Sequence, residues 1–121
     1  MALVEVDRKT VSISVEAPVG PKGSIVDFLY YVQATNEFQI AKPTITQGQD
    51  AGLAVYAKNT GTQNQRMRVD LILTDPTGSI EKRQGNVLEA VPGEEISPMF
   101  IWKCEKAGTY QAELVLLAEV M

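Results

Sequence analysis

The side chains that could do chemistry in this sequence are carboxylates, hydroxyls and one thiol, because none of the 121 residues is histidine. Histidine is the commonest general base and the commonest metal ligand, so no usual partner exists to activate a serine or threonine nucleophile. The single cysteine, Cys104, excludes an intrachain disulfide and a multi-cysteine zinc site. Cysteine is among the most buried residue types, so we expect Cys104 to be a small core residue.

Fifteen acidic residues invite a search for paired carboxylates. Glu94 and Glu95 are adjacent, but neighbouring strand residues point to opposite faces, and their place after "VPG" favours a solvated corner. Asp50, Asp75 and Glu94 lie in predicted loops, yet they lack the dense Asp/Asn spacing of a calcium loop. The stretch "GPKGS" lacks the spacing of a phosphate-binding loop. We therefore predict no catalytic residue, no metal site and no cofactor, and expect the protein not to be an enzyme.

Aromatic residues offer one further candidate site. Trp102 together with Tyr30 and Tyr31 could form a platform on which a sugar stacks. Trp102 has the same period-two phase as Ile96 and Phe100, which favours a core position for the indole instead. Carbohydrate binding therefore stays an alternative without direct support.

Composition and charge bound the partners. Apolar residues make up 45% of the chain and charged residues 21%, which indicates one globular domain with a real core. The net charge is -4, and the sequence contains no run of basic residues that could form a stripe, so we expect no nucleic-acid partner. We recognise neither a signal peptide nor an 18-residue apolar run, so we expect no membrane insertion. The compartment stays open among cytoplasmic, phage-borne and processed extracellular sources.

Strand patterns dominate from Phe38 onward. Apolar residues alternate with polar ones in "AGLAVYAKN", "RMRVDLILT" and "GTYQAELVLLAE", and turn signals such as "NTG" and "DPTG" separate the runs. "SIEKRQGNV" is polar and predicts an exposed edge strand, and Pro98 should interrupt the strand in "EEISPMFIWKC". The sequence therefore predicts an all-β antiparallel sandwich. Its expected core is Leu53, Val55, Val69, Leu71, Phe100, Trp102, Tyr110, Ala112 and Leu114.

The first 37 residues are less regular. "LVEV" and "TVSISVE" each alternate but are out of phase, and "APVGPKG" predicts a loop. Residues 24–35 fit either a short helix, with Ser24 and Asp27 as a capping box, or a strand rich in β-branched and aromatic residues. We favour the strand. We accordingly divide the chain into an N-terminal extension, residues 1–37, and a sandwich, residues 38–121, within one compact unit.

Five short motifs carry a resemblance to a family. "KNTG", "DPTG", "VPGE", "FIW" and "GTY" follow one another from residue 58 to residue 110. In that order they resemble CARDB-like and related bacterial and archaeal immunoglobulin-like domains, over roughly residues 38–119. The resemblance implies an immunoglobulin-like β-sandwich in which the Tyr110 hydroxyl bonds to upstream backbone. Such domains serve as adhesion, spacer and carbohydrate-associated modules or as parts of larger machines, and fold alone does not transfer function.

The resemblance leaves one strand unaccounted for. If Tyr110 opens the penultimate strand, the last strand should follow Val120, where the sequence stops. We expect the N-terminal extension to supply it, with Thr10–Glu16 and Val26–Val32 pairing near Gln111–Glu119, either within the chain or in a neighbouring chain. Apolar residues on the outer faces point to self-association or to another protein partner. The candidate interface residues are Val11, Ile13, Val15, Ile72, Met99, Ile101, Val115 and Leu117.

Two classes of function follow from these observations. The first is a non-catalytic structural or interaction module that associates with itself in a filament, virion accessory, surface or larger complex. The alternative is a ligand-binding module for carbohydrate. The solution mass at several concentrations would separate completion within the chain from assembly.

Overall fold

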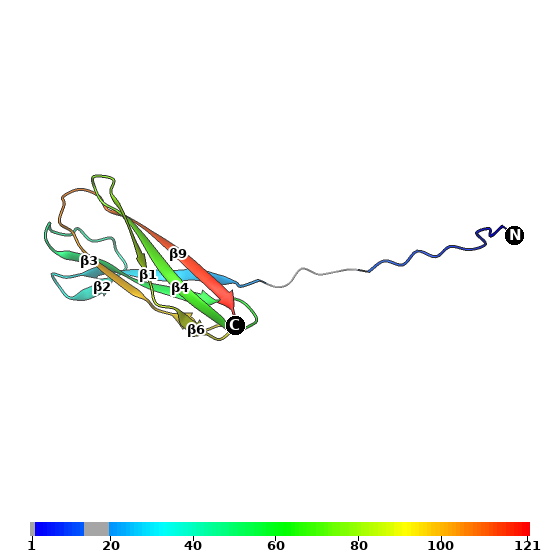
Figure 1. Cartoon of the computed structure of the whole chain (residues 1–121). Coiled ribbons are helices and arrows are strands. Elements are labelled where there is room, and N and C mark those ends of the chain that lie inside the picture. The colour runs from blue at the N-terminus through cyan, green and yellow to red at the C-terminus, as the bar shows by residue number, and fades with distance from the viewer. Residues whose placement is uncertain (1, 14–19) are drawn as a thin grey trace.

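A computed structural model describes residues 2–13 and 20–121, and these residues form strands and loops without a helix. The strands build two antiparallel sheets that face each other (Figure 1). Among these residues no helix is long and apolar enough to cross a membrane. The strands are β1 Gly23–Val32, β2 Glu37–Gln39, β3 Asp50–Asn59, β4 Gln65–Thr74, β5 Ile80–Gln84, β6 Leu88–Ala90, β7 Glu95–Ile96, β8 Met99–Lys103 and β9 Gln111–Val120.

The two sheets differ in strand order, and the second sheet has an open edge at β9. The first sheet runs β2-β1-β3, and β3 then pairs with both β7 and β8. In the second sheet β4 is central, with β5 and β6 on one side and β9 on the other. The β4–β9 ladder pairs all ten residues of each strand, from Gln65 opposite Val120 to Thr74 opposite Gln111. Among the described residues β9 has no second partner, so one of its edges is open.

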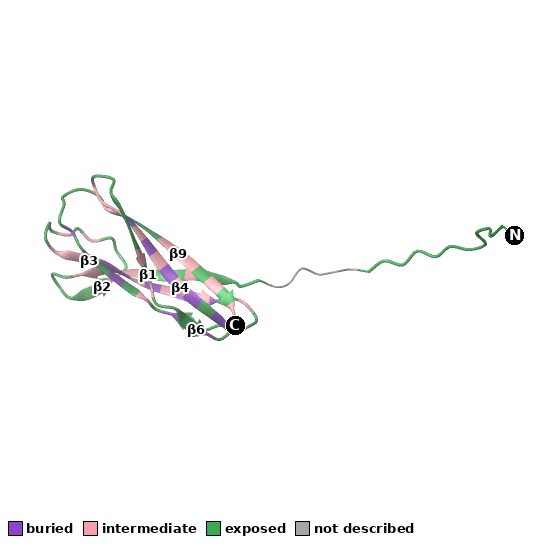
Figure 2. Ribbon diagram, viewed as in Figure 1, coloured by how far each residue is buried: buried purple, intermediate pink, exposed green. Residues whose placement is uncertain are grey.

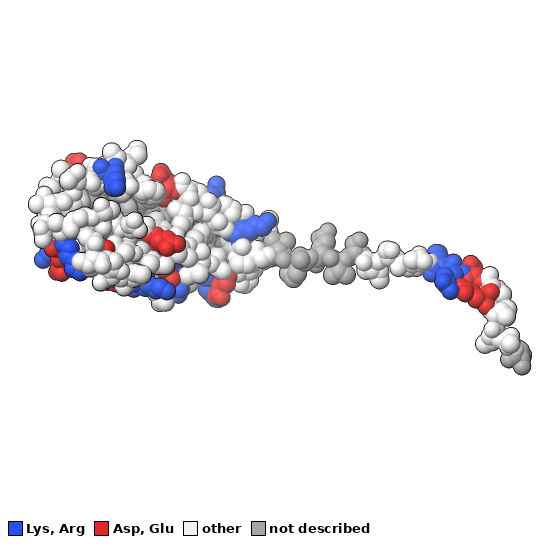
Figure 3. Space-filling model, turned by 90° about the horizontal axis from the view of Figure 1, so that it is seen from above, with Lys and Arg blue, Asp and Glu red and all other residues white. Residues whose placement is uncertain are grey.

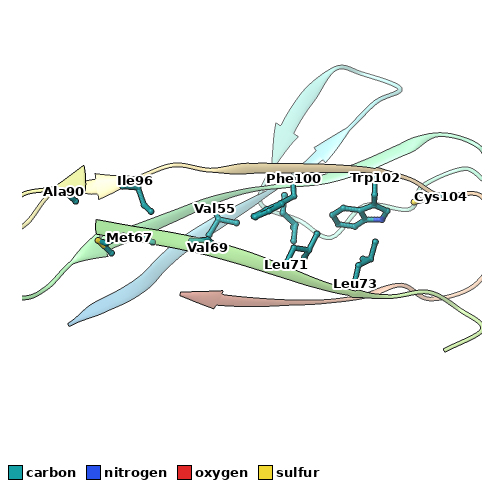
Figure 4. Close-up of a cluster of buried hydrophobic side chains, with 12 residues drawn as sticks. Val55, Met67, Val69, Leu71, Leu73, Ala90, Ile96, Phe100, Trp102 and Cys104 are labelled. Atoms are coloured by element: carbon teal, nitrogen blue, oxygen red, sulfur yellow. The ribbon is translucent and has the colours of Figure 1, made fainter. Parts of the chain in front are cut away.

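The core lies between the sheets and follows the period-two pattern. Along β4, alternate residues from Gln65 to Leu73 are buried, which appears as purple bands in Figure 2. The predicted core residues Leu53, Val55, Val69, Leu71, Phe100 and Trp102 are all buried, and Leu114 and Tyr110 pack against them. Figure 4 shows the side chains of Val55, Val69, Leu71, Phe100 and Trp102 between the two sheets. Ala112 was also predicted in the core, but it is exposed.

The predicted interruptions and turns are present. The strand that contains Pro98 is split into β7 and β8, and the Pro98 carbonyl accepts a hydrogen bond from the Val55 backbone N–H at 2.9 Å. In "DPTG" the Gly78 N–H donates to the Asp75 carbonyl at 3.0 Å, which closes the expected turn. The predicted polar edge strand is β5, which pairs with β4.

The N-terminal segment confirms one prediction and corrects another. Residues 23–32 form a strand, β1, so the helix alternative for residues 24–35 is wrong. The predicted partner of Val26–Val32 was also wrong, because β1 pairs with β3 along its whole length and with β2 at its end. The extension therefore does supply a strand, but to the first sheet. Residues 2–13 form no strand and are exposed, and residues 14–16 of the other predicted strand lie outside the described residues.

Candidate functional site: an open strand edge and a groove

The acidic residues considered as metal ligands are not brought together. Asp50 is the first residue of β3. Glu94 belongs to another segment and lies beside the last residue of β3, where its backbone carbonyl accepts a hydrogen bond from the Asn59 N–H at 2.9 Å. A strand of ten residues is about 33 Å long, so these two carboxylates cannot share an ion. Across the described ranges no group of three or more acidic or cysteine side chains could hold a metal. Acidic and basic side chains are interspersed over the face drawn in Figure 3.

Asp75 is instead part of a structural cluster in the β4–β5 turn. Its carboxylate accepts hydrogen bonds from the Thr77 N–H at 2.8 Å, the Thr77 hydroxyl at 2.6 Å and the Ser79 N–H at 3.0 Å, and it pairs with Lys106 Nζ at 2.7 Å. Lys106, and then Thr77, hold the pKa of Asp75 well below its ordinary value. Asp75 in turn raises the pKa of Lys106. The cluster ties this turn to the loop before β9.

Trp102 and Cys104 belong to the core rather than to a reactive site. Trp102 is 8% exposed and its indole nitrogen is covered, which confirms the predicted core position of the indole. Burial raises the pKa of the Cys104 thiol, which favours its protonated form. Tyr31 packs against Phe38, with ring centres 5.4 Å apart, and its hydroxyl bonds to Asn36 at 3.0 Å. All three aromatic residues of the proposed sugar platform line one groove, in which Trp102 is buried and the two tyrosines are half-buried.

A groove of about 670 Å³ opens between the two sheets beside the edge of β9. At one end the sheets touch, because the position of a Cβ on Gly23 would lie 2.8 Å from Leu116 Cδ2. Toward the other end they separate, and inward-facing side chains become accessible, as the 42% exposure of Phe28 shows. Two loops, residues 42–47 and 106–110, contribute to the lining. The strands contribute further residues, among them Phe28, Tyr30, Leu53, Trp102, Ala112 and Leu114. The open groove explains why Ala112 is exposed although it faces inward.

The edge of β9 runs along this groove. Its inward residues Leu114 and Leu116 pack against the core, while Val115 and Leu117 face outward, opposite Asp70 and Arg68 of β4. An edge strand presents unpaired N–H and C=O groups that another strand can use. The site therefore combines a backbone template with an apolar slot, which is the arrangement that accepts an added strand.

A buried amide pair fixes the point where the chain enters the sandwich. Gln65 and Asn59 are 1% and 0% exposed and are hydrogen-bonded to each other. Gln65 Oε1 accepts from the Lys22 N–H at 2.7 Å, and Gln65 Nε2 donates to the Lys22 carbonyl at 2.8 Å. Asn59 Nδ2 donates to the Ala90 carbonyl at 2.8 Å. Sequence reasoning missed this amide clamp, because its partners are backbone groups distant in the chain.

The N-terminal arm, residues 2–13, lies apart from the sandwich (Figure 1). Its apolar side chains are among the most exposed of the described residues. Val11 is 74% exposed and Ile13 is 85% exposed. Gly20, near the root of the arm, lies beside Val120, so the arm emerges at the end of β9 that is far from the groove. The arm thus contains apolar residues that its own domain leaves uncovered.

The predicted interface residues do not form a single surface. Val11 and Ile13 are in the arm, and Val15 lies outside the described residues. Ile72, Val115 and Leu117 are on the outer face of the second sheet, near the β9 edge. Met99 and Ile101 are on the outer face of the first sheet and are 53% and 37% exposed. The groove itself, with Phe28 and Ala112, was not predicted, because the pattern does not reveal where two sheets separate.

Comparison of the chain with family models, with curated proteins and with solved structures finds no match.

Proposed function

We propose that the protein is a non-catalytic structural module that associates with itself. The observation that carries this proposal is the coexistence of an open edge on β9 and an exposed apolar arm in one chain. Isolated exposed apolar residues are ordinary, but a strand edge beside an apolar groove indicates an interaction site. The assembly would be a filament, a virion accessory, a surface structure or a larger complex.

The proposed architecture is an immunoglobulin-like sandwich related to the CARDB-like domains. Three features support this proposal. The strand order β1-β3-β8 in one sheet and β5-β4-β9 in the other is compatible with such a sandwich without its last strand. The Tyr110 hydroxyl accepts a hydrogen bond from the Lys106 N–H at 3.2 Å, as expected of a tyrosine corner. The motifs "KNTG", "DPTG" and "GTY" lie at β3–β4, β4–β5 and the start of β9.

Sedimentation velocity over a wide range of concentration tests self-association. The module is expected to form species heavier than the 13.2 kDa chain, in proportions that rise with concentration. Replacing Val11 and Ile13 by lysine should shift the distribution toward the single chain. A single 13.2 kDa species at every concentration would contradict the proposal.

A carbohydrate ligand is the second candidate, and the observation that favours it is the groove, whose lining includes Phe28 and Tyr30. Their rings meet edge to face at 5.5 Å. Titration calorimetry with a panel of oligosaccharides tests this alternative. Binding that a Tyr30→Ala variant loses, in a protein that stays a single chain, would favour a ligand-binding module over self-association.

A further inference from the structure

We infer that the occupant of the groove is the N-terminal arm of a second copy, inserted as a strand antiparallel to β9. This inference rests on the proposed self-association and names its partner, its direction and its register. The groove needs an extended segment whose alternate side chains are apolar and of moderate size. Residues 10–13, "TVSI", meet this requirement, with Val11 and Ile13 on one face and Thr10 and Ser12 on the other.

The groove has room for as many apolar side chains as residues 10–13 supply. Inward-facing space exists beside Ala112 and Leu114, whereas beside Leu116 the two sheets are in contact at Gly23. Two apolar side chains of an added strand therefore find room. Arg8 and Lys9 precede the alternation, and in the arrangement inferred below Lys9 would lie beside Leu116, beyond the groove. The arm contains neither glycine nor proline from residue 2 to residue 13, so each N–H is available for a strand ladder.

The direction follows from where the arm begins. The amide clamp holds Lys22 at the Val120 end of β9, while the groove lies near the Gln111 end. An arm that folded back on its own domain would run parallel to β9, with Val11 nearer than Ile13 to Gln111. An arm that entered from a second copy at the Gln111 end would run antiparallel. Ile13 would then lie beside Ala112 and Val11 beside Leu114.

The two ends of one molecule are therefore complementary to each other rather than to themselves. One end presents the arm and the other end presents the groove. An interface of this kind is heterologous, so repetition gives a ring or an open filament instead of a closed two-fold dimer. Each added copy leaves one unused arm and one unused groove.

Two full-length variants test this arrangement by complementation. In the arm variant Val11 and Ile13 are both replaced by lysine, which leaves the groove intact. In the groove variant Ala112→Arg fills the groove and leaves the arm intact, and Ala112 is exposed, so the fold should tolerate the change. The matched controls are lysine at Thr10 and Ser12 in the arm, and Glu113→Arg on the outward face of β9.

We expect each variant alone to remain a single chain, with an apparent dissociation constant raised roughly a hundredfold. An equimolar mixture should form a complex with one copy of each variant and nothing larger, because its remaining arm and groove are both blocked. The control variants should assemble like the unmodified protein.

A mixture that stays as single chains, while the unmodified protein assembles, would overturn the arm-in-groove arrangement and leave self-association standing. An unmodified protein that is a single chain at all concentrations would overturn both proposals.

Discussion

Replacing the clamp residue Gln65 by leucine should destabilise the domain by about 2–3 kcal/mol. The side chain is 1% exposed and makes three hydrogen bonds, two to the backbone of Lys22 and one to Asn59. Each bond contributes about 1 kcal/mol net, and leucine recovers part of the loss by burying apolar surface. Asn59 Oδ1 keeps its bond from the Gly61 N–H at 2.9 Å, which limits the cost.

Urea unfolding followed by tryptophan fluorescence measures this loss, because the only tryptophan, Trp102, is buried in the core. A loss of this size should lower the midpoint by about 1–2 M urea. The control is Gln63→Leu, at an exposed side chain two residues away, which should change stability by less than about 0.5 kcal/mol. A loss for Gln65→Leu as small as that of the control would refute the role given to the clamp.

Three further changes test the core and the turns. Trp102→Ala should cost about 3–5 kcal/mol in urea unfolding, and a loss below about 1 kcal/mol would show that the indole is not a core group. Because the folded pKa of Asp75 lies below its ordinary value of 3.8, stability should fall as the pH drops below 3.8; Asp75→Asn should flatten that dependence, and an unchanged profile would contradict the Lys106 pairing. Gly85→Ala should destabilise by roughly 1–3 kcal/mol, because its Cβ would lie 2.2 Å from the Val69 carbonyl oxygen, and a neutral result would contradict that close approach.

The alternation of apolar and polar residues predicted the strands of the sandwich well, because alternate residues of a strand point to the same face and only one face of each strand is buried. The buried residues of β3, β4 and β8 follow it, and the polar pattern of β5 marked an edge. The pattern does not say which strand pairs with which. It therefore could not show that β1 pairs with β3 rather than with β9.

In the arm, the same alternation predicted strands that the structure does not contain. "LVEV" and "TVSISVE" alternate as strands do, yet residues 2–13 form none within this chain. Alternation shows that a segment can bury one face, whereas a strand also needs a partner for its backbone. The groove could not be predicted from the sequence for a related reason. Ala112 and Phe28 have the phase of core residues, and only the separation of the two sheets leaves them accessible.

Disulfide formation between separate chains tests most directly whether the arm of one copy lies beside β9 of another. One chain carries Ile13→Cys and the other carries Ala112→Cys, while the buried Cys104 is left unchanged. Side chains opposite each other on neighbouring antiparallel strands have Cβ atoms about 4.5–5.5 Å apart, close enough for a disulfide after a small adjustment.

We expect a cross-linked pair from this mixture and from Val11→Cys with Leu114→Cys, and little cross-linking from Ser12→Cys with Ala112→Cys. The absence of any link between separate chains would contradict the inferred arrangement. A link between Val11→Cys and Ala112→Cys that forms within a single, dilute chain would contradict it as well, because it would place the arm on its own domain and parallel to β9.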